Sequence, residues 1–158
     1  MKTNSKTIAF FTLVPLVAQL SPAVKQDDPL DAASLRGMLT GLAYEVKDLS
    51  TEAGKEKYEF TVKTTNFNIP LGAEISPSKN YIWLTANLGK VSEKTKWQEL
   101  VRANSIIQPT MFYATKSDIL MAAIPVENRS VTPALLKKGI DKIAADVDSQ
   151  STVWNTGG

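Results

Sequence analysis

Residues 118–147, DILMAAIPVENRSVTPALLKKGIDKIAADV, carry the clearest structural pattern in this chain. The continuous apolar run over residues 119–124 is typical of a strand that is buried on both faces. A polar turn follows, and Thr132 then stands where a helix N-cap is expected, with Pro133 at the first helical position. Behind them, apolar residues recur at spacings of four, three and four, which predicts an amphipathic helix. These residues are Leu136, Ile140, Ile143 and Val147.

An earlier helix is predicted over residues 29–48. Asp28 and Pro29 supply the start signal, as N-cap and first helical residue. Apolar residues then recur at helical spacing: Leu35, Met38, Leu39, Leu42 and Val46. Residues 49–55 contain Ser, Thr and Gly, and this composition predicts a loop.

Three strands are predicted after this loop, over residues 58–63, 66–75 and 81–88, because side-chain character alternates with the period of a strand. Pro70 has no N–H to donate, so the second of them is predicted to be an edge strand or to contain a bulge. The third strand has large apolar residues on both faces. Both of its faces are therefore expected to be covered at least in part.

A short helix over residues 97–104 and a strand over residues 110–114 complete the pattern. The resulting order is α-β-β-β-α-β-β-α, and runs of consecutive strands with short links predict an antiparallel sheet in an α+β domain. The first and last helices are expected to pack together over one face of the sheet. We predict a single domain over residues 24–148 and a flexible tail over residues 149–158.

The composition restricts the chemistry that the protein can perform. The chain has 158 residues, 43% of them hydrophobic, which suits one domain with one core. It has no cysteine and no histidine. Disulfides, thiolate metal sites, cysteine nucleophiles and Ser-His-Asp triads are therefore excluded. We predict a non-enzymatic protein without a metal or another cofactor.

The N-terminus has the pattern of a secretory signal peptide. Lys2 and Lys6 precede a largely apolar run over residues 8–20, and small residues follow at Ser21 and Ala23. A short buried helix is the alternative, but the run is not amphipathic and contains Pro15. We predict a signal peptide over residues 1–23 and a periplasmic or secreted protein. No cysteine follows the run, so no lipid anchor is expected to remain after cleavage.

The charge of the chain gives no sign of a nucleic-acid partner. The full sequence has 18 basic and 16 acidic residues, and two of the lysines lie in the predicted signal peptide. The remaining chain is therefore neutral. Binding to nucleic acid requires clustered Lys and Arg side chains to neutralise phosphates, and no basic stripe is present.

Three local segments, together with the element order, resemble a known superfamily. They are YIWL at residues 81–84, LVRAN at 100–104 before Pro109, and IPVENR at 124–129 before Val131-Thr132-Pro133. They are similar to segments of the type III secretion chaperone-like superfamily, which includes a bacterial sensory-transduction-regulator family. The likeness covers about residues 30–147. It implies that fold, and a small homodimeric protein that binds a polypeptide on sheet and helix surfaces.

Four aromatic residues are candidates for contact with a partner: Tyr81, Trp83, Trp97 and Tyr113. Aromatic side chains offer a large contact area at low entropic cost and are frequent in interface hot spots. The alternative is that they belong to the core of a small sheet domain.

The turn Glu127-Asn128-Arg129 supplies the last candidate. Arg129 offers a two-pronged donor set that suits an anion or a backbone. A solvated turn at the corner between strand and helix is the alternative. Asn128-Arg129-Ser130 also fits the acceptor pattern for N-glycosylation.

These observations favour an exported, homodimeric, chaperone-like or adaptor domain that binds a peptide or protein. One alternative is a hydrolase that works with a carboxylate pair such as Glu59 and Glu74, since two carboxylates suffice for glycoside hydrolysis. A structural envelope protein or small-ligand carrier is another. Asp27, Asp28 and Asp31 are acidic neighbours, but they lack the ligand spacing of a calcium loop and suit helix capping better.

Overall fold

The computed structural model of the chain describes residues 28–155. The predicted signal peptide, residues 1–23, lies outside the described residues. The structure is an α+β fold in which one antiparallel sheet packs against helices, which confirms the predicted α+β class and the antiparallel sheet.

Helix α3 (Pro133–Ser149) forms where the sequence predicts it. The Thr132 hydroxyl accepts a hydrogen bond from the Leu135 N–H at 3.2 Å, and Pro133 takes the first helical position. The predicted apolar stripe is fully buried, with 0% exposure at each of its residues. They are Leu136, Ile140, Ile143 and Val147. The N-cap and the helical phase are therefore both confirmed.

The sheet has six strands in the order β1-β2-β3-β4-β6-β5, all antiparallel to their neighbours. They are β1 (Lys47–Ser50), β2 (Lys57–Lys63), β3 (Asn68–Ile75), β4 (Tyr81–Lys90), β5 (Met111–Ala114) and β6 (Ile119–Glu127). Strand β6, which contains the apolar run at residues 119–124, lies between β4 and β5.

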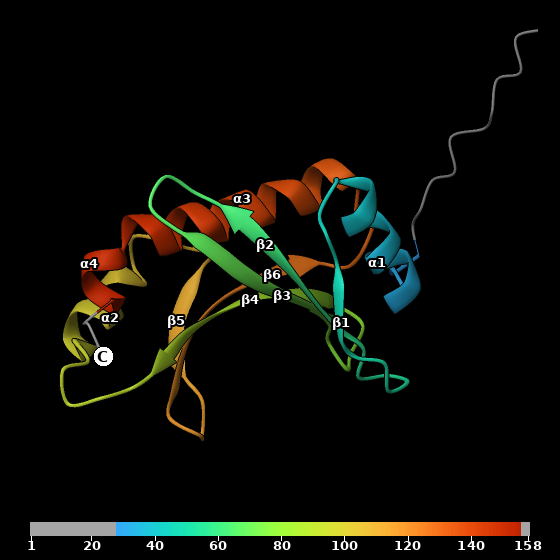
Figure 1. Cartoon of the computed structure of the whole chain (residues 1–158). Helices are drawn as coiled ribbons and strands as arrows, with labels where there is room; N and C mark the ends of the chain where they lie inside the picture. The colour runs from blue at the N-terminus through green and yellow to red at the C-terminus, as the bar shows by residue number, and fades with distance from the viewer. Residues whose placement is uncertain (1–27, 156–158) are drawn as a thin grey trace, which may run out of the picture.

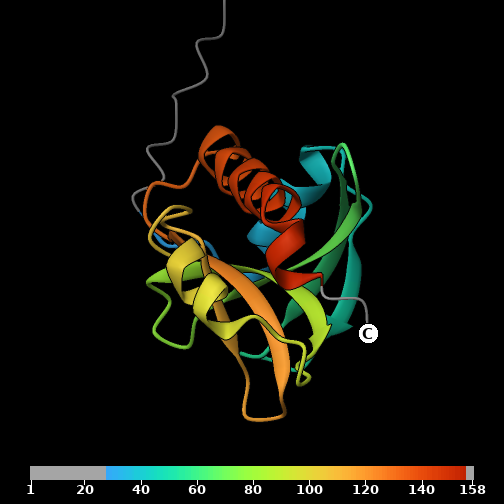
Figure 2. The same cartoon turned by 90° about the vertical axis from the view of Figure 1, so that its left-hand side faces the viewer.

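Helices α3 and α1 (Ala32–Gly41) lie on the same face of this sheet, as Figure 1 shows. Leu35 and Leu39 of α1 are completely buried in the shared core. Helices α2 (Trp97–Ala103) and α4 (Ser151–Trp154) lie together at the end of the sheet near β5. Within residues 28–155, no helix lies on the opposite face of the sheet (Figures 1 and 2).

Gly139 permits close approach between α3 and the sheet. A Cβ atom at this position would lie 2.8 Å from Val126 Cγ2 and 3.3 Å from Leu84 Cδ1. A larger side chain here would push the helix away from β4 and β6, because interiors are too densely packed to absorb it.

The structure contains one strand that the sequence did not predict. Helix α1 ends at Gly41 rather than near residue 48, and β1 pairs with β2. The helix stops in a Schellman motif, in which the Tyr44 N–H donates to Leu39 O at 3.3 Å and the Ala43 N–H donates to Thr40 O at 2.9 Å. Ala43 has a φ of 65°, a conformation that glycine usually adopts. Because this position holds alanine, the sequence pattern does not mark the end of the helix.

Two further predictions are corrected. The N-cap of α1 is Asp31, whose carboxylate accepts a hydrogen bond from the Ser34 N–H at 2.7 Å, and not Asp28. Hydrogen bonds from Ser34 hold the pKa of Asp31 below its ordinary value. Strand β3 lies inside the sheet, so the prediction of an edge strand from Pro70 is wrong. The ladder to β4 begins only at Leu71, and Pro70 therefore pairs with β2 alone.

The segment expected to be a flexible tail contains structure. Residues 149–154 include the end of α3 and the helical turn α4. The Trp154 indole N–H donates to Val147 O at 2.6 Å, and its ring centroid lies 5.5 Å from that of Phe67. These contacts fasten α4 to the end of the core.

Asn128 ties three segments of the chain together from a completely buried position. Its side-chain amide accepts from the Leu30 N–H at 3.0 Å and donates to Leu30 O at 3.1 Å and to Lys79 O at 3.0 Å. The alternative of a solvated turn holds for the exposed Glu127 and Arg129, but it is wrong for Asn128. Because this amide is buried and hydrogen-bonded, it is inaccessible to glycosylation in the folded protein.

The phase of α3 is tested by a pair of substitutions. Ile140→Asp places an unpaired carboxylate in the core and is expected to lower the free energy of unfolding by about 4 kcal/mol or more. Lys138→Asp, on the exposed side of the helix, is expected to cost under about 0.5 kcal/mol. Urea denaturation followed by circular dichroism measures both, and equal losses would contradict the observed packing.

The role of Asn128 is tested in the same way. Asn128→Ala removes the partners of one buried N–H, one buried carbonyl and one partly buried carbonyl, so we expect a loss of about 3 kcal/mol in the free energy of unfolding. Arg129→Ala is the matched control, because the neighbouring side chain is exposed and should change stability by less than about 0.5 kcal/mol. A small effect of Asn128→Ala would show that these segments do not depend on the amide.

Candidate functional site

The uncovered face of the sheet bears a shallow hollow of about 350 Å³. Its lining is largely apolar and comes from four strands, β3, β4, β5 and β6. The lining residues are Glu74, Trp83, Thr85, Met111, Tyr113 and Ala123. This hollow is the candidate functional site.

Strand register brings these side chains together. Trp83 on β4 is flanked by Glu74 on β3 and by Pro125 on β6. In the next row, Ala123 lies between Thr85 on β4 and Met111 on β5. Residues directly opposite each other on antiparallel strands contact through their side chains, so each row forms a continuous strip across the sheet.

Gly72 keeps the neighbouring part of the face flat. A Cβ atom on Gly72 would lie 2.7 Å from the Thr85 hydroxyl oxygen, which is too close for any other residue without a shift. Because Gly72 has no side chain, the Thr85 side chain can pack against β3, where it forms part of the floor of the hollow.

The Tyr113 ring is partly desolvated in this position. Burial raises the pKa of its phenol, the charge of Glu74 adds to the rise, and the charge of Lys57 opposes it. The phenol therefore lies within electrostatic reach of both groups. Glu74 and Lys57 form a salt bridge of 3.0 Å, so the rim of the hollow beside β2 carries paired charges.

The structure gathers three of the five candidate residues on this face. Trp83 and Tyr113 line the hollow, and the Tyr81 ring lies with its centroid 6.4 Å from that of Trp83. Trp97 lies on α2, outside the hollow, and Arg129 lies exposed at the corner between β6 and α3. Tyr81, Trp97 and Tyr113 are 45%, 44% and 38% exposed, so none of these three is a core residue.

Sequence reasoning missed Met111, Thr85 and Ala123 as parts of the site. Met111 and Tyr113 are two residues apart on one strand and so share a face, a signal that was present in the sequence. Thr85 carried the same signal, because it stands two residues after Trp83 on β4. Ala123 carried none, because only the pairing of β6 with β4 and β5 makes it a neighbour of these side chains.

The carboxylate pair proposed for a hydrolase does not converge on one cleft. Glu59 and Glu74 share the open face of the sheet, since Glu59 pairs with Gly72 and Lys57 pairs with Glu74. They line different hollows, however, and Glu74 is engaged by Lys57. The arrangement therefore gives a hydrolytic mechanism no support.

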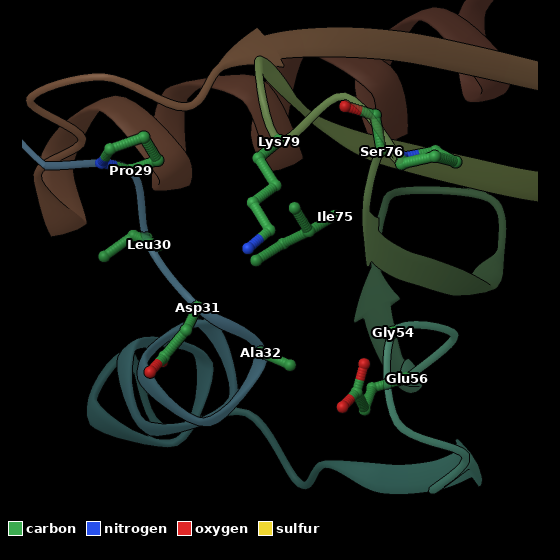
Figure 3. A pocket seen from close by; sticks show the side chains of 10 residues that line it. Pro29, Leu30, Asp31, Ala32, Gly54, Glu56, Ile75, Ser76 and Lys79 are labelled. Carbon is green, nitrogen blue, oxygen red and sulfur yellow. The ribbon is translucent and has the colours of Figure 1, made fainter.

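A second hollow, of about 270 Å³, lies where the start of α1 meets the turn between β3 and β4. Figure 3 shows the Lys79 amine extending into it, with Glu56 on the far side and apolar walls at Leu30 and Ile75. The nearby Asp31 carboxylate is already occupied as the N-cap of α1. The walls of this hollow are polar and apolar in equal measure, whereas the walls of the hollow on the sheet are mostly apolar.

Within residues 28–155, no group of three acidic side chains is arranged to hold a metal ion. Asp31 caps α1, and Asp27 lies outside the described residues. Over the same range, we find no helix with the length and apolar character needed to span a bilayer.

The edge of the sheet beside the hollow is closed by a side chain. The Asn104 amide donates to Phe112 O at 3.1 Å and accepts from the Phe112 N–H at 2.7 Å. It thus takes the place that a further strand would occupy on β5. A partner is consequently blocked from adding a strand at this point.

Comparison with known proteins gives no match to a family model, to a curated protein or to a solved structure.

The closure of β5 is tested by Asn104→Ala. This change frees the Phe112 N–H and C=O for pairing with another chain, so we expect self-association that increases with protein concentration. Sedimentation velocity measures it. Ser105→Ala, one residue away on the exposed side, is the control and should leave the sedimentation coefficient unchanged. Equal behaviour of both variants would mean that Asn104 does not protect the edge.

Proposed function

We propose that this domain is a non-enzymatic binding module that holds a polypeptide partner on the open face of its sheet. The observation that carries the proposal is the convergence of Trp83, Tyr113 and Met111 around one shallow apolar hollow. A soluble domain has no structural need for large aromatic groups on an uncovered face. Contiguous apolar surface of this kind marks sites of interaction.

The chemistry of the hollow suits side chains of a protein. Aromatic rings offer large, rigid contact surfaces, and they dominate the binding energy of many interfaces. The charges at the rim are paired in the Lys57–Glu74 salt bridge, so an apolar group can enter the hollow without exposing an unpaired charge to a low dielectric.

The geometry favours binding across the face over pairing at an edge. Strand β5 is occupied by Asn104. Strand β1, at the other edge, has only four residues and a register shift between Asp48 and Ser50. Short and bulged edge strands resist the addition of another strand. The partner is therefore expected to contribute side chains rather than a strand.

The sequence extends this proposal in three respects. We propose that the fold is of the type III secretion chaperone-like kind, with β1 and α4 as additions to the expected element order. We also propose that the protein functions as a homodimer. Its place of action is the periplasm or the extracellular space, as the predicted signal peptide indicates.

Site-specific photo-crosslinking in the host tests the binding face. A photoreactive amino acid replaces Met111, which is 39% exposed in the hollow, or Leu135, which is 51% exposed on α3. We expect a defined cross-linked protein from position 111, and none from the control position 135. A cross-link to the protein itself would identify the homodimer contact.

The same cross-link is then measured with Trp83→Ala. Loss of a central aromatic contact is expected to weaken binding roughly thirtyfold, equivalent to about 2 kcal/mol. Circular dichroism confirms that the variant is folded. Recovery of the same partners from both positions, or a cross-link unaffected by Trp83→Ala, would disprove binding in the hollow.

A further inference from the structure

A second apolar surface lies on α2 and the loop that follows it, away from the hollow on the sheet. Trp97, Val101 and Ile106 are 44%, 67% and 76% exposed. Val101 and Ile106 are the most exposed of the large hydrophobic residues in the described chain. We call Trp97, Val101 and Ile106 the α2 patch. Figure 2 shows α2 at the periphery of the molecule, outside both the sheet and α3.

The α2 patch is held in its exposed position. Leu100 and Ala103, on the other side of the helix, are buried in the core. The Asn104 side chain fastens the end of α2 to β5, and the Lys142 amine donates to Ile107 O at 2.8 Å. Because these contacts fix the rotation of the helix, Trp97 and Val101 cannot turn inward.

Positive charge accompanies the patch. Residues 90–106 contain four basic and two acidic side chains, whereas residues 28–155 as a whole contain fifteen of each. Arg102 lies beside Trp97, Val101 and Gln98 around a shallow surface depression. Lys96 contacts Glu99 at 3.6 Å, on the side of α2 that meets α4. The segment therefore carries an excess of positive charge in a domain that is neutral as a whole, and Arg102 places a cation beside the apolar side chains.

Protruding apolar side chains within basic surroundings suit an anionic lipid surface. Tryptophan favours the level of the lipid headgroups, and Arg and Lys side chains are attracted to acidic headgroups. Short amphipathic segments bind in this way by burying apolar side chains at the boundary between headgroups and acyl chains. The hollow on the sheet differs, because its rim charges are paired.

We propose that the α2 patch docks the domain on a membrane surface that contains anionic lipid. Trp97, Val101 and Ile106 enter the interfacial region, and Arg102 faces the phosphates. The docking is peripheral. It does not depend on the proposed partner site, since none of these residues lines the hollow on the sheet.

The test uses the full chain, which has no cysteine and so allows a single label to be placed at will. Gln98→Cys puts an environment-sensitive fluorophore beside the α2 patch without removing its apolar residues. Lys138→Cys puts the same label on the exposed side of α3. Each protein is titrated with vesicles of equimolar phosphatidylglycerol and phosphatidylcholine, or of phosphatidylcholine alone.

We expect a blue shift of the label at position 98 with the anionic vesicles, and little change at position 138. Addition of Val101→Ser and Ile106→Ser to the first protein should weaken partitioning by about tenfold or more. Arg102→Glu should weaken it on anionic vesicles alone, and added salt should have the same direction of effect.

Four results would overturn the proposal. One is the absence of a shift at position 98, and another is an equal shift with both kinds of vesicle. An equal response at positions 98 and 138 would attribute binding to the apolar run at residues 8–20 instead. A shift that depends on protein concentration without vesicles would show that the patch contacts a second copy.

Discussion

The packing of α3 on one face of the sheet is the constraint on which the rest of the structure depends. Its buried stripe meets β4 and β6 at the closest point allowed by Gly139. At that contact the helix and these two strands share one set of core side chains, and α1 adds Leu35 and Leu39 to it. The hydrophobic energy of the domain is thus concentrated on a single face.

This one-sided core determines where the protein can interact. With α1 and α3 on one face, the side chains that alternate with the core residues along each strand point to the open side. On β4, Ile82 and Leu84 are completely buried, while Tyr81 and Trp83 between and beside them face away. Tyr81 and Trp83 therefore lie outside the core and are available for contacts with other molecules.

Polar side chains fix the parts of the chain that the hydrophobic core leaves loosely defined. The Asn128 side chain, at the corner between β6 and α3, hydrogen-bonds to Leu30 just before α1 and to Lys79 in the turn between β3 and β4. At the other end, Asp146 of α3 accepts hydrogen bonds from the buried Thr110 hydroxyl and from the Lys142 amine. Lys142 also reaches the loop after α2. These bonds hold β5 and α2, and so they hold both Met111 in the hollow and the exposed side chains of the α2 patch.

The sequence by itself determined the elements whose signals are local. The cap at Thr132, the phase of α3 and the α+β class depend on spacing and on residues near in the chain, and the structure confirms them. Only the tertiary structure decided the rest. Strand β1 forms because Ala43 adopts a conformation expected of glycine and β2 supplies a partner. Asn128 is buried because its amide hydrogen-bonds to the backbone of Leu30, which lies 98 residues away in the sequence. Trp83, Met111 and Tyr113 form one site because β4 and β5 both lie beside β6, a pairing between distant segments that no local pattern can specify.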